Sequence, residues 1–379
     1  MSLSIEIQNT TGGVLYAYVT GTTTADALFL LQSNGTTAYY PTSPSTTLSA
    51  LAVDCAIAVS SAGTTSLTVP YLSGARLWFS RGSQPLTFYL NPGPALVEPS
   101  VSNTSDVNYE IAWDFCEFTF TSTELYANIT YVDFVCLPIA LSLTDTQGAT
   151  QTVSGMPADG LQTVCDALQA QNETDGAGWD QLVITSSSTG AYLRAVSPNT
   201  GIAMDDTLFD GYYDTYVTEV WDMYTDTELT VDTQISYGDV TGKVVEDDED
   251  DDEDEEQVLT FTDGVAIYTT PASADIFSCS SGPFTPSGTT EKDDITARLA
   301  AAFNRSTLLI DSNQPEGEVV STYYQADITN HYARICHATD LDGEGYAFPY
   351  DDVGPTDGAD ISGSVVSSSP ALWTVVVGG

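Results

Sequence analysis

Two carboxylates, Glu117 and Asp133, lie on the two arms of a predicted β-hairpin within residues 113–138. Apolar and polar residues alternate along both arms, which is the period of strands with one apolar and one polar face. Two acids that face one groove can hydrolyse a sugar acetal, because one protonates the leaving oxygen while the other activates water or attacks the anomeric carbon. The alternative is an exposed hairpin whose acids are simply solvated.

The parity of Asp133 is a difficulty for this interpretation. Strict alternation places Asp133 on the same face as Ile129 and Tyr131, opposite to Asn128 and Thr130. We therefore predict a bulge near Val132 that turns Asp133 into the groove. Diagonal neighbours across a hairpin lie about 7–8 Å apart, within the roughly 6.5–9.5 Å between carboxyl groups that an inverting reaction requires.

Other residues that could carry chemistry are few. Arg76 or Arg81 is predicted at the rim of the groove, where a guanidinium would tune the carboxylates, although both could be ordinary surface residues. His331 and His337 have no evident third ligand, and residues 340–351 imitate a calcium loop without the flanking helices. We therefore expect neutral structural imidazoles, no metal site and no cofactor.

The six cysteines show no metal-ligand spacing. Cys116 and Cys136 flank the hairpin and could bridge its arms, or they could be buried free thiols.

The charge balance is extreme, with 53 acidic residues against 8 Lys and Arg in 379 residues and a net charge of −45. Such a charge repels nucleic acid and anionic membranes and favours a neutral or cationic partner. The N-terminus lacks the charged and apolar regions of a signal peptide. Either the leader is missing from this form of the chain, or export does not follow the usual route.

The pattern along the chain predicts a mainly β protein that is interrupted by a mixed α/β unit. Strands occupy residues 1–112, helices are expected at 159–170, 207–224 and 295–304, and β character returns in 318–324, 332–338, 345–350 and 372–377. The run 246–256 is almost unbroken Asp and Glu and is predicted to be a disordered loop tip. We therefore predict a β domain of 1–140 plus 316–379 and an inserted α/β domain of 141–315.

Several motifs together resemble glycoside hydrolase family 64, whose fold is related to that of thaumatin-like proteins. The hairpin carries Glu-Phe-Thr-Phe (117–120) and Leu-Tyr-Ala-Asn-Ile-Thr-Tyr-Val-Asp-Phe (125–134). Gly-Tyr-Ala-Phe-Pro-Tyr-Asp-Asp (345–352) looks like the C-terminal element of the same fold. Segments 273–284, 298–309 and 329–337 are similar to parts of the family's inserted domain and of the return from it.

The resemblance implies a thaumatin-like β-barrel or sandwich domain and an endo-acting β-1,3-glucan hydrolase with an inverting mechanism. Glu117 matches the general acid and Asp133 the general base. The residues expected to bind the sugar are Thr119, Asn128, Thr130, Arg76, Tyr346, Asp351 and Asp352, with one or both of the two aspartates on the cleft wall. Two features depart from the resemblance: six cysteines cannot form the disulfide framework of thaumatin-like proteins, and the acidic run has no counterpart.

The expected substrate is laminarin, curdlan or a fungal wall glucan, from which short laminari-oligosaccharides would be released. The resemblance also implies an extracellular protein, which we expect to be a monomer with no nucleic-acid or membrane partner. The main alternative is a thaumatin-like glucan-binding protein without turnover. A second alternative is a structural or adhesive β protein whose charge serves solubility alone.

Overall fold

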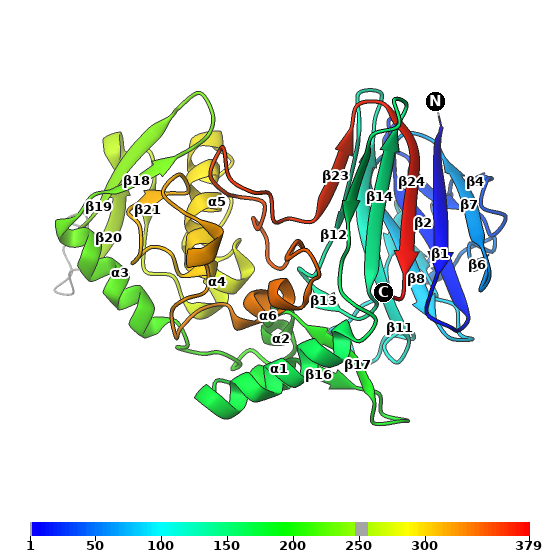
Figure 1. Cartoon of the computed structure of the whole chain (residues 1–379), viewed down its shortest axis with the longest axis horizontal. Coiled ribbons are helices and arrows are strands. Elements are labelled where there is room, and N and C mark those ends of the chain that lie inside the picture. Colours follow the sequence, from blue (N-terminus) through cyan, green and yellow to red (C-terminus); the bar gives the residue numbers. More distant parts are fainter. Residues whose placement is uncertain (1, 247–256) are drawn as a thin grey trace.

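The computed structural model describes residues 2–246 and 257–379, and the predominance of β-strands confirms the mainly β prediction. Two groups of elements lie side by side in Figure 1, one built almost wholly of strands and one that combines a small sheet with helices. Most of the predicted acidic loop falls outside the described residues. None of the described helices is long and apolar enough to span a membrane.

Two large sheets form the strand-rich group. In the first, the strand order is β15 (Thr150–Val153), β14 (Ile139–Asp145), β24 (Pro370–Val377), β1 (Leu3–Asn9) and β7 (Thr64–Val69). In the second, the order is β23 (Ser364–Ser367), β12 (Leu125–Ile129), β11 (Ala112–Phe120), β8 (Leu72–Arg81), β2 (Leu15–Thr23), β3 (Leu28–Leu31) and β4 (Ala38–Tyr39), and β6 (Ile57–Val59) also pairs with β2. Both strand orders have free ends, so the barrel alternative is not seen in the described chain.

Three smaller sheets complete the β structure of the described residues. Their strand orders are β10 (Ala95–Val97), β9 (Tyr89–Asn91), β5 (Ser49–Ala50); β13 (Phe134–Val135), β17 (Tyr192–Val196), β16 (Val183–Thr185); and β21 (Ile267–Tyr268), β20 (Gln257–Phe261), β19 (Asp239–Glu246), β18 (Leu229–Asp232), β22 (Asn313–Gln314).

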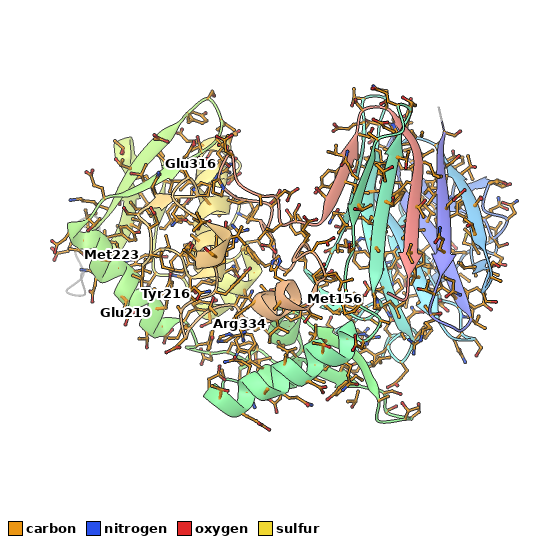
Figure 2. The ribbon with its side chains drawn as sticks, in the orientation of Figure 1. Met156, Tyr216, Glu219, Met223, Glu316 and Arg334 are labelled. Carbon is orange, nitrogen blue, oxygen red and sulfur yellow. The ribbon has the colours of Figure 1, made fainter. Side chains whose placement is uncertain are left out.

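The helices are α1 (Gly160–Asp175), α2 (Pro198–Met204), α3 (Asp214–Asp226), α4 (Ser273–Ser278), α5 (Thr290–Arg305) and α6 (His331–Thr339). Short 3-10 turns occur at Trp179–Leu182, Thr262–Gly264, Gly282–Phe284 and Val320–Thr322. On α3, Tyr216 is buried while Glu219 is exposed (Figure 2), and the aromatic side chains of this helix, Tyr216, Trp221 and Tyr224, belong to the core.

Strand β11 joins the core to the site. Cys116, Phe118 and Phe120 are each at most 2% exposed and face the core, whereas Glu117 and Thr119 are partly exposed. The ring of Phe118 lies 5.1 Å from that of Trp373 in β24, so the two large sheets pack face to face at this point. The alternation predicted for this strand is therefore present, and its polar positions are held at the surface by the burial of its apolar ones.

Some predicted elements are wrong. Residues 332–338 form helix α6 instead of a strand, because the Asn330 side chain caps the first turn by accepting a hydrogen bond from Ala333 N–H. Segments 318–324 and 345–350 are turns, although Tyr346 makes a parallel bridge with Thr130. Helix α3 starts at Asp214 rather than at 207, since Phe209 and Gly211 have positive φ angles that a right-handed helix excludes.

The sheet pairing also shows which residues belong to the strand-rich group. Strand β14 extends across the expected boundary at residue 140 and pairs with both β24 and β15, so the strand-rich group includes residues up to Val153. On the return, β22 still pairs with β18 and the chain rejoins the large sheet only at β23.

All six cysteines are buried free thiols, and Cys116 and Cys136 do not bridge the hairpin. Of the two alternatives left open by the sequence, the free thiol is the one observed.

Asp114 ties β11 to the segment that follows Asp133. It is 2% exposed, and its Oδ2 accepts hydrogen bonds from the N–H groups of Cys136 and Leu137, each at 2.9 Å. Its Oδ1 accepts the Phe115 N–H at 2.8 Å. Burial raises the pKa of Asp114 to about 7, although these N–H donors and Arg194 oppose the shift.

We expect Asp114→Ala to lower the free energy of unfolding by about 2–4 kcal/mol, because it leaves buried N–H groups without an acceptor. Asp114→Asn should lower the free energy of unfolding by less, because asparagine has nearly the shape of the protonated acid and keeps one acceptor oxygen. Urea titration at pH 7 measures both variants. An alanine variant as stable as the wild type would show that this carboxyl does not anchor the segment.

Candidate active site

A cavity of about 600 Å³ opens on the polar side of β11 and β12. It brings together seven of the nine site residues expected from the sequence: Arg76, Glu117, Asn128, Thr130, Asp133, Tyr346 and Asp352. Phe115, Tyr126 and Val132 complete its lining. Segments more than 200 residues apart in the chain thus meet around one space.

Strand register places three of these side chains in a row. Glu117 pairs with Arg76 of β8 on one side and with Asn128 of β12 on the other. Directly opposed residues of neighbouring strands have Cβ atoms about 4.5–5.5 Å apart. A cation, an acid and an amide are therefore presented side by side to whatever enters the cavity.

Asp133 reaches the cavity by a different route from the predicted bulge. β12 ends at Ile129, its pairing with β11 is in continuous register, and the backbone bends at Val132 and Asp133. Because the strand has already ended, its alternation no longer constrains Asp133. The bulge prediction is wrong, but the side chain it was meant to explain does line the cavity.

The bend is held from both sides. Tyr131 is buried, and its hydroxyl donates a hydrogen bond to Asp340 Oδ2 at 2.8 Å, while the Tyr332 hydroxyl donates to the Tyr131 carbonyl at 2.7 Å. The Asp133 carbonyl accepts the Ser197 N–H at 2.9 Å. With the residues around it fixed, the Asp133 side chain is left facing the cavity.

Arg76 is the cation of the site. Its Nε donates to Glu117 Oε1 at 3.1 Å, and its second donor group reaches Glu98 Oε2 at 2.7 Å. Its guanidinium carbon lies 4.5 Å from the centre of the Phe115 ring, a cation–π contact that limits where the group can move. Arg81, the alternative rim cation, is exposed at the end of β8 and lines none of the cavities described here.

Asp133 and Glu117 have different surroundings. Burial raises the pKa of Asp133 above its usual range, and the Arg76 guanidinium only partly opposes this. Glu117 keeps 39% of its side chain exposed and is ion-paired with Arg76. The two carboxyls at the centre of the cavity are thus chemically inequivalent.

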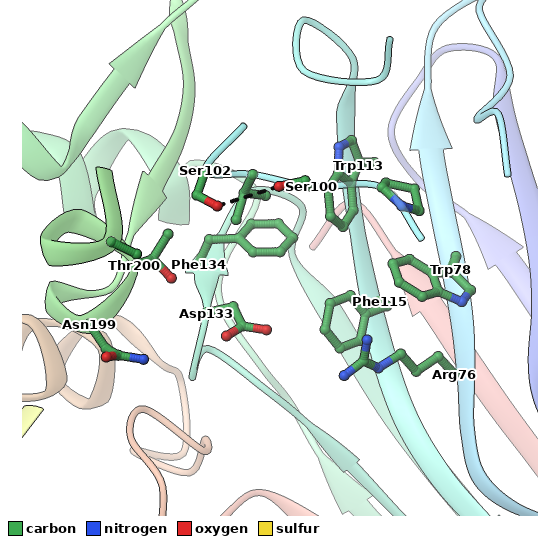
Figure 3. Close-up of a pocket in the computed structure, with 13 residues that line it drawn as sticks. Arg76, Trp78, Ser100, Ser102, Trp113, Phe115, Asp133, Phe134, Asn199 and Thr200 are labelled. Atoms are coloured by element: carbon green, nitrogen blue, oxygen red, sulfur yellow. Dashed lines mark hydrogen bonds between the residues drawn. The ribbon is translucent and has the colours of Figure 1, made fainter. Parts of the chain in front are cut away.

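Two smaller cavities adjoin the first. One of about 250 Å³ shares Arg76, Phe115 and Asp133 with it and extends between Trp78, Ser100 and Asn199 (Figure 3). The other, of about 210 Å³, contains Thr119 together with Glu117, Tyr126 and Asn128. Thr119 therefore lies beside the main cavity rather than in it.

Asp351 does not reach the cavity. It is 0% exposed, and its Oδ1 lies 3.1 Å from an Arg305 nitrogen while its Oδ2 lies 2.9 Å from His337 Nε2. Asp351 Oδ2 also accepts the Ala347 N–H at 2.9 Å. Of the two neighbouring aspartates, Asp352 lines the cavity, and Asp351 anchors the turn that carries Asp352 and Tyr346.

The surroundings of His337 favour a doubly protonated ring. Its Nδ1 faces the Gly343 carbonyl at 2.9 Å and its Nε2 faces the Asp351 carboxylate, and both partners can only accept. Burial lowers the pKa of His337, but the Asp351 carboxylate and the Gly343 carbonyl together outweigh burial and raise it overall. The two acceptors and the raised pKa argue against the neutral imidazole expected for His337.

His331 matches that expectation. Arg334 (Figure 2) donates a hydrogen bond from its Nε to His331 Nδ1 at 3.0 Å. His331 Nε2 lies 3.1 Å from the Asp327 carbonyl, so one ring nitrogen accepts and the other donates, as expected for a neutral ring. Burial, followed by the charge of Arg334, lowers the pKa of His331.

The sequence interpretation missed Glu98, Tyr126 and, apart from Arg76 and Asp133, the residues of the adjoining 250 Å³ cavity. Tyr126 occupies a polar position of β12, two residues before Asn128, and the alternation could have identified it. Glu98 follows the short strand β10 in a different sheet, and no sequence pattern connects it with the hairpin.

Comparison with known proteins gives one consistent result. The family model for β-1,3-glucanase matches residues 1–377. Glucan endo-1,3-β-glucosidases of Cellulosimicrobium cellulans and of Arthrobacter sp. (strain YCWD3) are each 31% identical over 291 residues, which is 76% of this chain and 50% of theirs. The chain thus spans about half the length of these curated relatives.

Solved structures agree with this similarity. A laminaripentaose-producing β-1,3-glucanase in complex with laminaritetraose has a TM-score of 0.84 and 28% identity, with 99% of this chain and 98% of that one covered. A β-1,3-glucanase domain from Clostridium beijerinckii has a TM-score of 0.74 and 22% identity, again with 99% and 98% covered, and shows the shared fold.

The His337–Asp351 pair predicts how stability depends on pH. Because the pKa of His337 is raised on folding, the charged ring stabilises the folded state fully below the usual histidine pKa of about 6.5. This stabilisation is lost as the pH rises through the raised pKa of the folded state. His337 and Arg305 outweigh burial and lower the pKa of Asp351, so its contribution is present above the usual aspartate value of about 3.9 and is lost in acid.

We expect His337→Gln to lower the free energy of unfolding by about 2–4 kcal/mol between roughly pH 4 and pH 6.5, and by less at higher pH. Thermal and urea unfolding from pH 4 to pH 9 measure this difference. His331→Gln is the matched control, since the His331 ring is neutral and its loss should not remove the decline above pH 6.5. A constant difference between wild type and His337→Gln across this range would contradict a charged His337.

Proposed function

The chain belongs to glycoside hydrolase family 64, the β-1,3-glucanases, and on this basis we propose that it is an endo-acting hydrolase of β-1,3-glucan. The single observation that carries the proposal is that Glu117 and Asp133 line one open cavity together with hydroxyl, amide and aromatic side chains. Groups of this kind bind a neutral sugar chain through hydrogen bonds and apolar contacts. A neutral glucan is also compatible with the net charge of −45.

We propose an inverting mechanism. Glu117 protonates the glycosidic oxygen of the leaving chain, and Asp133 removes a proton from a water that attacks the opposite face of the anomeric carbon. The raised pKa of Asp133 favours this role, since a carboxylate whose pKa lies closer to the working pH is a stronger base. Asn128, Thr130, Tyr346 and Asp352 line the cavity beside the two acids and would orient the sugar.

The finer parts of the family resemblance belong to the same proposal. They are a thaumatin-like β domain formed by the two ends of the chain, an inserted α/β domain, an extracellular location and a monomeric state. We also propose laminarin, curdlan or a fungal wall glucan as the substrate and short laminari-oligosaccharides as the product, because the chain is similar to glucan endo-1,3-β-glucosidases and to a laminaripentaose-producing β-1,3-glucanase. Because the chain spans about half the length of those curated relatives, its activity is a proposal that direct measurement tests.

We expect the wild type to release reducing sugar from laminarin and Glu117→Gln to lose about 10²–10⁴-fold in kcat/KM, the usual contribution of a general acid. Glu124→Gln is the matched control, because it makes the same change on the exposed turn of the same hairpin. Binding of laminarin by the wild type without release of sugar would replace the enzyme by the glucan-binding alternative. Absence of any binding would favour a structural protein.

The stereochemistry of the product tests the two roles. We expect α-anomers to appear first when laminarin hydrolysis is followed by NMR, because direct attack by water inverts the β-linkage. Since mutarotation mixes the anomers within minutes to hours, spectra are taken early and at high enzyme concentration. Initial β-anomers would mean retention, with one acid acting as nucleophile, and would overturn the assignment of Asp133 as base.

A further inference from the structure

Arg76 is shared between two carboxylates, and only one of them belongs to the proposed acid and base pair. Its contact with Glu98, at 2.7 Å, is shorter than its contact with Glu117, at 3.1 Å. Glu98 and Arg76 keep 36% and 30% of their side chains exposed, so both are partly withdrawn from water. The guanidinium is therefore held by Glu98 as well as by Glu117.

The position of Glu98 separates it from the sugar-binding wall. It follows β10 and precedes Pro99 and Ser100, which line the adjoining 250 Å³ cavity. In Figure 3 the guanidinium of Arg76 lies beneath Phe115 and points toward Asp133. Glu98 thus contacts the site through its ion pair with Arg76.

A lone guanidinium beside Glu117 would be a problem for the proposed reaction. An adjacent cation stabilises the ionised form of a carboxyl group, whereas a general acid must carry a proton when substrate binds. Three carboxylates, Glu98, Glu117 and Asp133, surround this one guanidinium. The arrangement therefore holds more negative charge than Arg76 can neutralise, which favours one retained proton.

We propose that Glu98 is a positioning residue for glucan hydrolysis: it holds and neutralises Arg76, so that Glu117 can carry the proton it donates. This inference rests on the proposed function, because it presupposes that Glu117 is the general acid. In the reaction Glu98 forms and breaks no bond.

The acids around Arg76 influence one another. Burial raises the pKa of Glu98, Arg76 opposes the shift, and the carboxylates of Glu117 and Asp133 raise it further, so the three acids act on one another. The other titratable groups that line the cavity are Tyr126, Tyr346 and Asp352. Burial raises the pKa of both tyrosines, which therefore remain neutral, and Asp352 adds further negative charge.

The test is the pH profile of kcat/KM on laminarin for Glu98→Gln. Glutamine has nearly the same shape and can still accept a hydrogen bond from Arg76, so the substitution removes charge and keeps geometry. We expect the alkaline limb of the profile to move to lower pH by about one unit, with kcat at the acid end of the range within about twofold of wild type. Glu124→Gln, on the exposed turn, should leave the profile unchanged.

A double variant separates charge from structure. In Arg76→Gln/Glu98→Gln the cation and its counter-charge are removed together, so the alkaline limb should return toward its wild-type position even if the absolute rate is lower. Thermal unfolding of each variant verifies that it is folded under the assay conditions.

Two results would overturn the inference. One is a Glu98→Gln variant whose activity falls equally at every pH, which would make Glu98 a structural support only. The other is a profile identical to that of the wild type, which would leave Glu98 without a role. Failure of the wild type itself to release sugar would instead reject the proposed function, so the two failures can be distinguished.

Discussion

The side chains of β11 alternate between a buried core and an open cavity, and this alternation constrains everything around the site. Phe118 and Phe120 are fixed between the two large sheets, with Phe118 packed against Trp373. A shift of one residue in register would bury Glu117 and expose these rings. The burial of aromatic surface therefore sets where the proposed acid stands, and neighbouring strands then present Arg76 and Asn128 on either side of it.

Charge is balanced locally in a protein whose overall charge is strongly negative. At the cavity one guanidinium serves Glu98 and Glu117 and also acts on Asp133. In the interior, Arg305 pairs with Asp351, which in turn pairs with His337. With so few cations in the chain, Arg76 and Arg305 each have defined carboxylate partners.

The buried pair and the cavity are physically connected. Asp351 accepts the Ala347 N–H, and this fixes the turn between Tyr346 and Asp352, two residues of the cavity wall. Tyr346 also bridges to Thr130, just before the bend that presents Asp133. The wall and the proposed base are therefore positioned by one continuous set of backbone contacts, supported by charges that lie out of reach of the substrate.

Local patterns in the chain were enough to predict the mainly β class, the two faces of the hairpin, the family and most of the residues that meet in the cavity, because alternation and motif are local properties. They did not determine that residues 332–338 form a helix, nor that Asp351 is buried while Asp352 is not, since both depend on which distant groups offer partners. The bend that turns Asp133 into the cavity and the contact between Glu98 and Arg76 were decided only by tertiary structure. Each joins segments from different sheets, and the pairing of those segments follows from the packing of the whole core rather than from any stretch of sequence.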